Sequence, residues 1–300
     1  MDQELLSRNP NDVQFCWEQV ERVRPLFRLS YVYSTVPEQA RLLALYALLC
    51  ALEEPLYSVS DPEVIRAKIA WFHQELLGEN FETSNHPVIR LVYQSGAIPH
   101  EGFDVLHQHI DSTLNRIEPE TPSDETEFRS LCTLGTRSAA KLELYGITPG
   151  FARDADMLSA CALSGLVQLL RESSRKSSRD FTWVPLYMRA RHQLSLADLE
   201  RGIKSVEIES LFRDLSDTGL SWFTSENMQE LCAASSQSGL SRNRFNHWLI
   251  QLKLQRNLLE RVRELKLSQH NKVFSTVWFG GAWQTWRFAR KLNWQGLSKR

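Results

Sequence analysis

The segment from residue 41 to 55, RLLALYALLCALEEP, sets the strongest constraint on how the chain can fold. Its apolar residues recur at the i, i+3 and i+4 spacing of a helix. The positions in that series are Leu42, Leu45, Tyr46, Leu49 and Leu52. Most other positions are apolar as well, so the pattern predicts a helix that is buried on all sides at the centre of the fold. Pro37 suits its first turn, and Pro55 is predicted to end or kink it.

Helical periodicity extends along nearly the whole chain. A capped helix is predicted from Asp61-Pro62 to about Gly78, another from Pro87, and a loop over residues 116–123, which contain two prolines. Further helices are predicted over residues 124–145, 151–172, 195–214, 222–236, 240–267 and 272–291. Of these, 151–172 is a second central helix, whose small residues at 159–165 indicate close packing or a cavity wall. A capping box at Ser195–Asp198 opens the 195–214 helix. We therefore expect an all-α protein formed by a single bundle of about ten helices.

Composition excludes several classes of protein. The 300 residues carry a net charge of −1, which gives no overall attraction to nucleic acid, so no nucleic-acid partner is expected. The N-terminus lacks a secretory signal pattern, and no apolar run approaches the roughly 20 residues that span a bilayer, so we expect a cytoplasmic location. The cysteines are widely spaced and are expected to be reduced thiols. They are Cys16, Cys50, Cys132, Cys161 and Cys232.

Several short motifs, taken in order, resemble those of the squalene/phytoene synthase family. They are FRLSY at 27–31, LYAL at 45–48, Trp71, HPV at 86–88, QLLRE at 168–172, WVP at 183–185 and GGAW with WR at 280–287. The resemblance covers residues 27–290 of one helical domain over 1–300, with 1–20 as an N-terminal extension and 291–300 as a basic tail. It implies the type I isoprenoid synthase fold, a helical bundle around a deep central cavity.

The resemblance also indicates where a metal site would lie. Active members of the family join two prenyl diphosphates head to head, and hold Mg²⁺ for this between two acidic motifs on facing helices. The first motif aligns with Glu53, Glu54 and Tyr57, so two carboxylates remain and the last acidic position is a phenol. The alternative is that both glutamates are the polar end of a buried helix. In the second motif the acidic positions are Glu172 and Lys176, and lysine repels a metal cation. The metal candidates are therefore Glu53, Glu54 and Glu172, and occupancy by three metal ions is not expected.

Basic residues follow the second motif. Arg171, Arg175 and Arg179 are spaced four apart and, with Lys176, would form a cationic stripe on a helix. Three interpretations stay open: the stripe binds a diphosphate or lipid headgroup without metal, it is a solvated basic turn, or Lys176 pairs with Glu53 or Glu54 and fills the former metal site. The family's arginine before its closing motif has no match here, because Phe181 takes its position.

Two further regions are candidates for binding. The resemblance suggests that Ser30 and Tyr31 line the diphosphate end of the cavity, although packing at the start of the bundle is an equal alternative. Residues 278–300 combine aromatic and basic side chains and contain no acidic residue. We expect this segment to dock on the bundle through about Phe288, and the short tail after it to touch anionic lipid or a partner at the membrane periphery.

Three functions remain open on these grounds. The first is a non-catalytic member that binds an isoprenoid, another lipid or a protein partner, as in the phytoene-synthase-like assembly factors of respiratory complex I that the resemblance extends to. The second is a Mg²⁺-dependent prenyltransferase that uses Glu53, Glu54 and Glu172. The third is a structural helical protein whose cavity has filled. We favour a protein that is not an enzyme, with no cofactor expected, and with Mg²⁺ only under the second reading.

Overall fold

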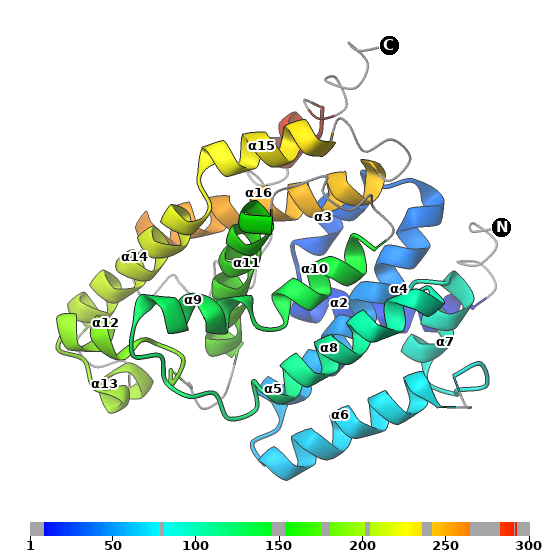
Figure 1. Ribbon diagram of the computed structural model, residues 1–300, viewed down its shortest axis with the longest axis horizontal. Helices are drawn as coiled ribbons and strands as arrows, with labels where there is room; N and C mark the ends of the chain where they lie inside the picture. The colour runs from blue at the N-terminus through cyan, green and yellow to red at the C-terminus, as the bar shows by residue number, and fades with distance from the viewer. Residues whose placement is uncertain are drawn as a thin grey trace.

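The computed structural model describes residues 9–78, 81–145, 154–175, 181–201, 205–235, 242–264, 283–290 and 292. No strand occurs within these ranges, which confirms the predicted all-α class (Figure 1). Also within these ranges, every helix is too short or too polar to cross a membrane.

The helices of the N-terminal half surround the first central helix. They are α2 (Pro10–Val23), α3 (Phe27–Tyr31), α4 (Val36–Glu53), α5 (Pro55–Ser58), α6 (Pro62–Leu77), α7 (Pro87–Ser95), the 3₁₀ turn η1 (His100–Gly102) and α8 (Phe103–Leu114). The predicted central helix is α4, and its fully buried Leu43, Leu48 and Leu49 lie on different faces. As predicted, the helix stops before Pro55, because proline lacks the N–H that would continue the hydrogen-bond ladder.

The helices of the C-terminal half surround the second central helix, α11. They are α9 (Glu125–Thr133), α10 (Thr136–Glu143), α11 (Asp154–Arg175), α12 (Leu186–Arg191), α13 (Leu196–Arg201), α14 (Ser205–Trp222), α15 (Ser225–Ser235) and α16 (Arg242–Glu264). The described residues form more than the ten helices predicted, because several of the helices are short. Residues 283–290 are also helical, and the rest of the segment predicted as a helix over 272–291 lies outside the described residues.

Several helix ends confirm the sequence signals. The Asp61 side chain accepts a hydrogen bond from the backbone N–H of Glu63 at the start of α6. Ser195 and Asp198 form the reciprocal bonds of a capping box before α13. The helix predicted over 195–214 is found as α13 and the first part of α14, with residues 202–204 between them outside the described residues.

The predicted single helix over 124–145 is wrong. It is divided into α9 and α10 at Gly135, whose φ of +81° lies in the left-handed region that glycine tolerates at little cost. The break lets the chain change direction, so that α9 packs against α11 while α10 packs against both α8 and α11.

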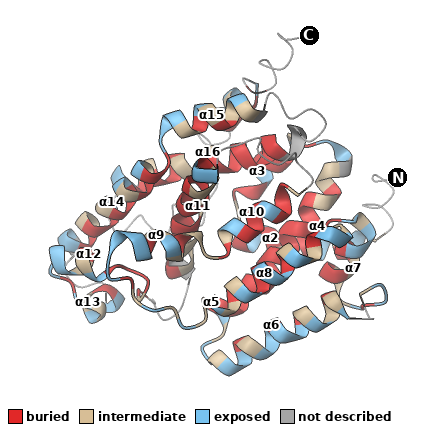
Figure 2. Cartoon of the chain, in the orientation of Figure 1, coloured by how far each residue is buried: buried red, intermediate tan, exposed pale blue. Residues whose placement is uncertain are grey.

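Two apolar cores fill the molecule. One surrounds α4 and includes buried residues of α2, α6, α7 and α8, and the other surrounds α11 and includes residues of α9, α14 and α16. Figure 2 shows the buried residues gathered on the inner faces of these helices. Of the five cysteines, all are free thiols and all but Cys232 are buried, as predicted. The boundary between the cores, where α4 and α10 face α11 and α16, is where a central pocket lies.

Candidate functional site

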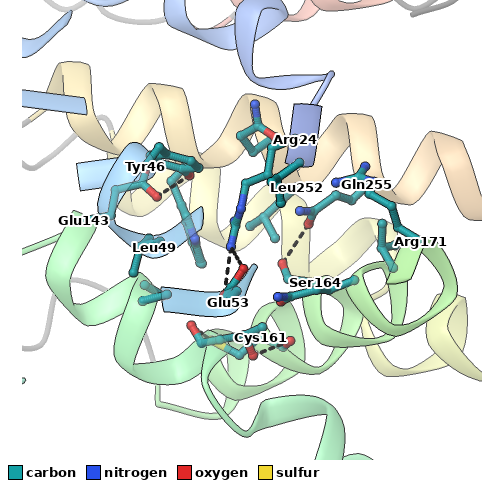
Figure 3. Close-up of a pocket in the computed structure, with 18 of the residues that line it drawn as sticks. Arg24, Tyr46, Leu49, Glu53, Glu143, Cys161, Ser164, Arg171, Leu252 and Gln255 are labelled. Atoms are coloured by element: carbon teal, nitrogen blue, oxygen red, sulfur yellow. Dashed lines mark hydrogen bonds and ion pairs between the residues drawn. The ribbon is translucent and has the colours of Figure 1, made fainter. Parts of the chain in front are cut away.

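The central pocket is small and has both polar and apolar walls. It has a volume of about 60 Å³ and is lined from α4, α10, α11 and α16, together with the end of α2. Its walls carry three carboxylates, those of Glu53, Glu143 and Glu172, and two guanidinium groups, those of Arg24 and Arg171 (Figure 3). Pockets that take small organic ligands commonly have volumes of about 300–1,000 Å³, so this interior has room for a few waters and little more.

Glu53 is the best buried of the predicted metal ligands, with 2% of its surface exposed. It ends α4, and its carboxylate oxygens accept hydrogen bonds of 2.9 and 3.1 Å from Nη2 of Arg24. Arg24 caps the C-terminal end of α2, and its guanidinium also lies over the ring of Tyr46, 5.3 Å from the centroid. Dashed lines in Figure 3 mark the two hydrogen bonds between Arg24 and Glu53. The first predicted ligand is therefore held by an arginine from another helix.

Glu172, in α11, is bound in the same way by a second arginine. Nη2 of Arg116 lies 2.8 and 3.0 Å from the two carboxylate oxygens of Glu172. Nη1 of the same guanidinium lies 4.0 Å from an oxygen of Glu53. Arg116 follows α8 and its side chain is only 7% exposed, so a fixed positive charge stands between the two carboxylates that the sequence assigned to Mg²⁺.

The electrostatic balance keeps these groups charged. Burial alone would raise the pKa of Glu53, but the guanidinium groups of Arg24 and Arg116 outweigh burial and hold that pKa below its usual value. For Arg116, burial would lower the pKa, and the carboxylates of Glu172 and Glu53 raise it above the ordinary value instead. Each charge is thus neutralised inside the protein by its partner.

This set of donors does not fit a magnesium ion. Mg²⁺ needs carboxylate and water oxygens in near-octahedral order, and a guanidinium against each carboxylate both repels the ion and uses the lone pairs. Tyr57 lines the pocket with a neutral phenol where the family has an acidic residue. Among the described residues, no group of three His, Cys, Asp or Glu side chains is arranged to hold a metal.

Glu54, the other predicted ligand of the first motif, faces a different cavity. Adjacent residues on a helix point about 100° apart, so Glu53 and Glu54 cannot both enter the same pocket. Glu54 lines an outer cavity of about 240 Å³ together with Lys68, Trp71 and His86. This outer cavity, between α2, the α4–α5 junction, α6 and the start of α7, is larger than the central one.

The structure also places the predicted anion-binding residues. Arg171 lines the central pocket, Arg175 is the last residue of α11, and Lys176 and Arg179 lie outside the described residues. Lys176 was one predicted partner for Glu53. Among the described residues it is Arg24 and Arg116 that take this position.

Ser30 and Tyr31 lie in packing contacts beside the pocket. The Ser30 hydroxyl donates to the backbone carbonyl of Phe27 and accepts from the Gln251 amide, and Gln251 rather than Ser30 lines the pocket. The ring of Tyr31 packs against Trp17, with centroids 4.7 Å apart.

A second buried polar cluster was not anticipated from the sequence. Glu143, 4% exposed, accepts a 2.7 Å hydrogen bond from the hydroxyl of Tyr46 and lies 2.7 Å from Nδ1 of His247. Burial and the Glu143 carboxylate raise the pKa of Tyr46 well above its usual value, so the phenol stays a donor. This cluster joins α4, α10 and α16 across the pocket. Neither its residues nor Arg24 and Arg116 carry any local spacing signal, because their partners are distant in sequence.

Comparison with known proteins confirms the fold. No family model and no curated protein sequence matches the chain. Solved structures do: the squalene synthase HpnC from Alicyclobacillus acidocaldarius aligns over 92% of this chain and 98% of its own, with a TM-score of 0.59 and 15% identity. A dehydrosqualene synthase in complex with ligand gives a TM-score of 0.57 and 16% identity, over 98% of this chain and 99% of its own.

A third similar structure is YisP from Bacillus subtilis subsp. subtilis strain 168, with a TM-score of 0.53 and 14% identity over 94% of this chain and 97% of its own. At these identities the likeness shows the fold. The chain has the all-helical, squalene/phytoene synthase-like fold that its ordered sequence landmarks implied.

Proposed function

We propose that this chain is a non-catalytic protein of the squalene/phytoene synthase-like fold, which acts by binding a protein partner at its surface. The observation that carries the proposal is the position of Arg116 between Glu172 and Glu53. A prenyl transfer of the family's type begins when Mg²⁺ neutralises a leaving diphosphate. Here an internal guanidinium neutralises the carboxylates that would have bound that ion.

The size of the central pocket also argues against an isoprenoid carrier. A pocket of about 60 Å³ is well below the range of about 300–1,000 Å³ that ligand sites commonly have. Its lining includes the charged side chains of Arg24, Glu53 and Glu172, and a hydrocarbon chain in the pocket would exclude water from these groups at a cost in free energy.

The surface offers a more suitable place for binding. The outer cavity of about 240 Å³ is walled by Trp71, Phe72 and His86 and carries the charged Glu54 and Lys68 at its sides. Trp71 is 42% exposed. A cavity of this size can hold one bulky side chain, and such aromatic anchors provide much of the binding energy of protein interfaces. A protein partner therefore fits this cavity better than an isoprenoid fits the central one.

The test is incubation of the purified protein with farnesyl and geranylgeranyl diphosphate, with and without Mg²⁺. Released diphosphate and reaction products are measured by mass spectrometry, and bound lipid is sought by native mass spectrometry. We expect no Mg²⁺-dependent release and no bound isoprenoid.

The Glu53→Gln variant is the matched control, because it removes the central carboxylate of the first motif. Mg²⁺-dependent turnover that is present in the wild-type protein and absent from this variant would overturn the proposal. A stoichiometric isoprenoid in the native mass spectrum would show that the pocket opens to a lipid, and would also overturn it.

A further inference from the structure

The short helix at residues 283–290 has two different faces. One face packs on the protein, with Thr285 and Ala289 each 3% exposed. The opposite face presents Trp283 and Trp286, which are 55% and 39% exposed, and the exposed Arg287 and Arg290. This helix is the red ribbon near the C-terminal end in Figure 1. We call these four side chains the Trp–Arg patch.

The two tryptophans form an ordered pair on the outside of the protein. Their rings are stacked, with centroids 4.9 Å apart and an angle of 23° between the planes. The guanidinium of Arg290 lies 4.8 Å from the centre of the Trp286 ring. Such contacts fix the indoles without burying them, although tryptophan commonly buries most of its surface in a folded protein. The patch is therefore positioned to contact a partner outside the helical bundle.

Within its own segment of the chain, the patch is accompanied by charges of a single sign. Residues 278–300 contain five basic residues and no acidic one. Neither Arg287 nor Arg290 forms an ion pair with a described residue, whereas arginines elsewhere in the chain do, such as Arg263 with Asp217. A surface that combines exposed indoles with arginines that pair with no described residue is complementary to a negatively charged partner that also has an apolar boundary.

We propose that the Trp–Arg patch binds the surface of an anionic lipid bilayer. Tryptophan is enriched where headgroups meet acyl chains, since its ring is apolar and its N–H can stay hydrogen-bonded. Arginine pairs with lipid phosphates through charge-assisted, forked hydrogen bonds. The surface of an anionic bilayer presents lipid phosphates for the arginines next to an apolar region for the indoles. The neighbouring basic residues add electrostatic attraction, which salt weakens. The helix lies on the bilayer, because eight residues cannot cross it.

The patch shares no residue with the central pocket, so its test does not depend on the proposed function. The purified full-length chain is sedimented with vesicles of pure phosphatidylcholine and with vesicles in which a third of the lipid is phosphatidylglycerol. We expect binding to the anionic vesicles, and weaker binding to them at high salt.

Three variants test whether the side chains of the Trp–Arg patch bind the vesicles. Trp283→Ala with Trp286→Ala removes the indoles, and Arg287→Gln with Arg290→Gln removes two charges, which should lower partitioning to anionic vesicles by about 25-fold. Tyr93→Ala is the matched control, since Tyr93 is another exposed aromatic residue, lies in helix α7 and lines neither cavity. Thermal melting establishes that each variant is folded.

Loss of binding in both patch variants with retention in Tyr93→Ala supports the proposal. Wild-type protein that leaves the anionic vesicles in the supernatant would overturn it. Equal binding by the wild type and the patch variants, or equal binding to both kinds of vesicle, would also overturn it. If a variant fails to fold, the wild-type protein alone gives the test: binding to anionic vesicles that salt does not weaken would overturn the proposal.

Discussion

The guanidinium of Arg116 reaches both oxygens of the Glu172 carboxylate from a single nitrogen, Nη2, at 2.8 and 3.0 Å. The two residues come from different parts of the chain, one after α8 and one in α11, and their side chains are 7% and 15% exposed. Their ion pair links the segment that follows α8 to the central helix of the C-terminal core. The stability of the protein should therefore depend on charge pairs in its interior.

Arg116→Met should destabilise the protein strongly. It removes the partner of Glu172, whose carboxylate is 15% exposed, and breaking a fully buried pair commonly costs about 3–5 kcal/mol of unfolding free energy, which is the upper limit here. The urea midpoint and slope give the change. Arg66→Met is the control, since Arg66 forms its ion pairs with Glu63 and Glu118 on the surface, and it should have little effect. Equal midpoints for the two variants would contradict the role of Arg116.

Adding Glu172→Met to Arg116→Met should recover most of the loss. The second substitution removes the uncompensated carboxylate, and replacing a buried ion pair with apolar side chains of similar size is often neutral or stabilising. A double-mutant cycle in urea measures the coupling energy between the two positions. Losses that simply add would show that the pair is not coupled, and that the single variant acts through packing alone.

His109 should make stability depend on pH. Burial lowers the pKa of its imidazole from 6.5 to about 4, although the Glu53 carboxylate acts in the opposite direction. Between pH 6.5 and about pH 4, His109 binds a proton in the unfolded chain but not in the folded protein. The free energy of unfolding therefore decreases as the pH is lowered through this range. The shift corresponds to about 3 kcal/mol in full.

The measurement is urea unfolding at several pH values between 4.5 and 6.5. His109→Gln should flatten the dependence, because glutamine has no proton to bind. His100→Gln, at an exposed position, is the control and should leave the dependence as in the wild type. If the His109 variant keeps the wild-type slope, another group is responsible.

Gly165→Ala should be severely destabilising. A Cβ atom at Gly165 would lie 1.6 Å from the backbone carbonyl oxygen of Cys132, so helices α11 and α9 would have to separate. Overpacking in a core costs about 1–3 kcal/mol or more, and here backbone rather than a side chain must move. Gly102→Ala is a milder comparison, since its nearest atoms, 3.3 Å away, belong to the side chains of Ile98 and Pro99. Similar melting temperatures for both variants would disprove the close crossing.

Part of the candidate site could be predicted from the sequence. Glu53, Tyr57 and Glu172 were assigned to one site through the motif resemblance, and all three line the central pocket, as does Arg171, whose role the sequence left open. Glu54 was assigned there too, but helical geometry turns it toward the outer cavity. Arg24 and Arg116 were missed, since 29 residues separate Arg24 from Glu53 and 56 separate Arg116 from Glu172.

The ends of the helices likewise include some that the sequence predicts and one that it does not. Caps and prolines mark the ends of α4 and α6 correctly because a helix end depends on the few residues around it. The break at Gly135 was missed because a single glycine within a helical pattern costs only about 1 kcal/mol, which tertiary contacts can decide either way.

The sequence by itself determined the helical class, the burial of α4 and the weakening of both acidic motifs, since periodicity and residue identity are local properties. Only the tertiary structure decided that Arg24 and Arg116 pair with Glu53 and Glu172, that the pocket is about 60 Å³, and that Trp283 and Trp286 stay outside. The physical reason is that pairing, volume and exposure depend on which distant segments pack together. Helical periodicity shows which face of a helix is apolar, but it does not determine the partner that covers that face.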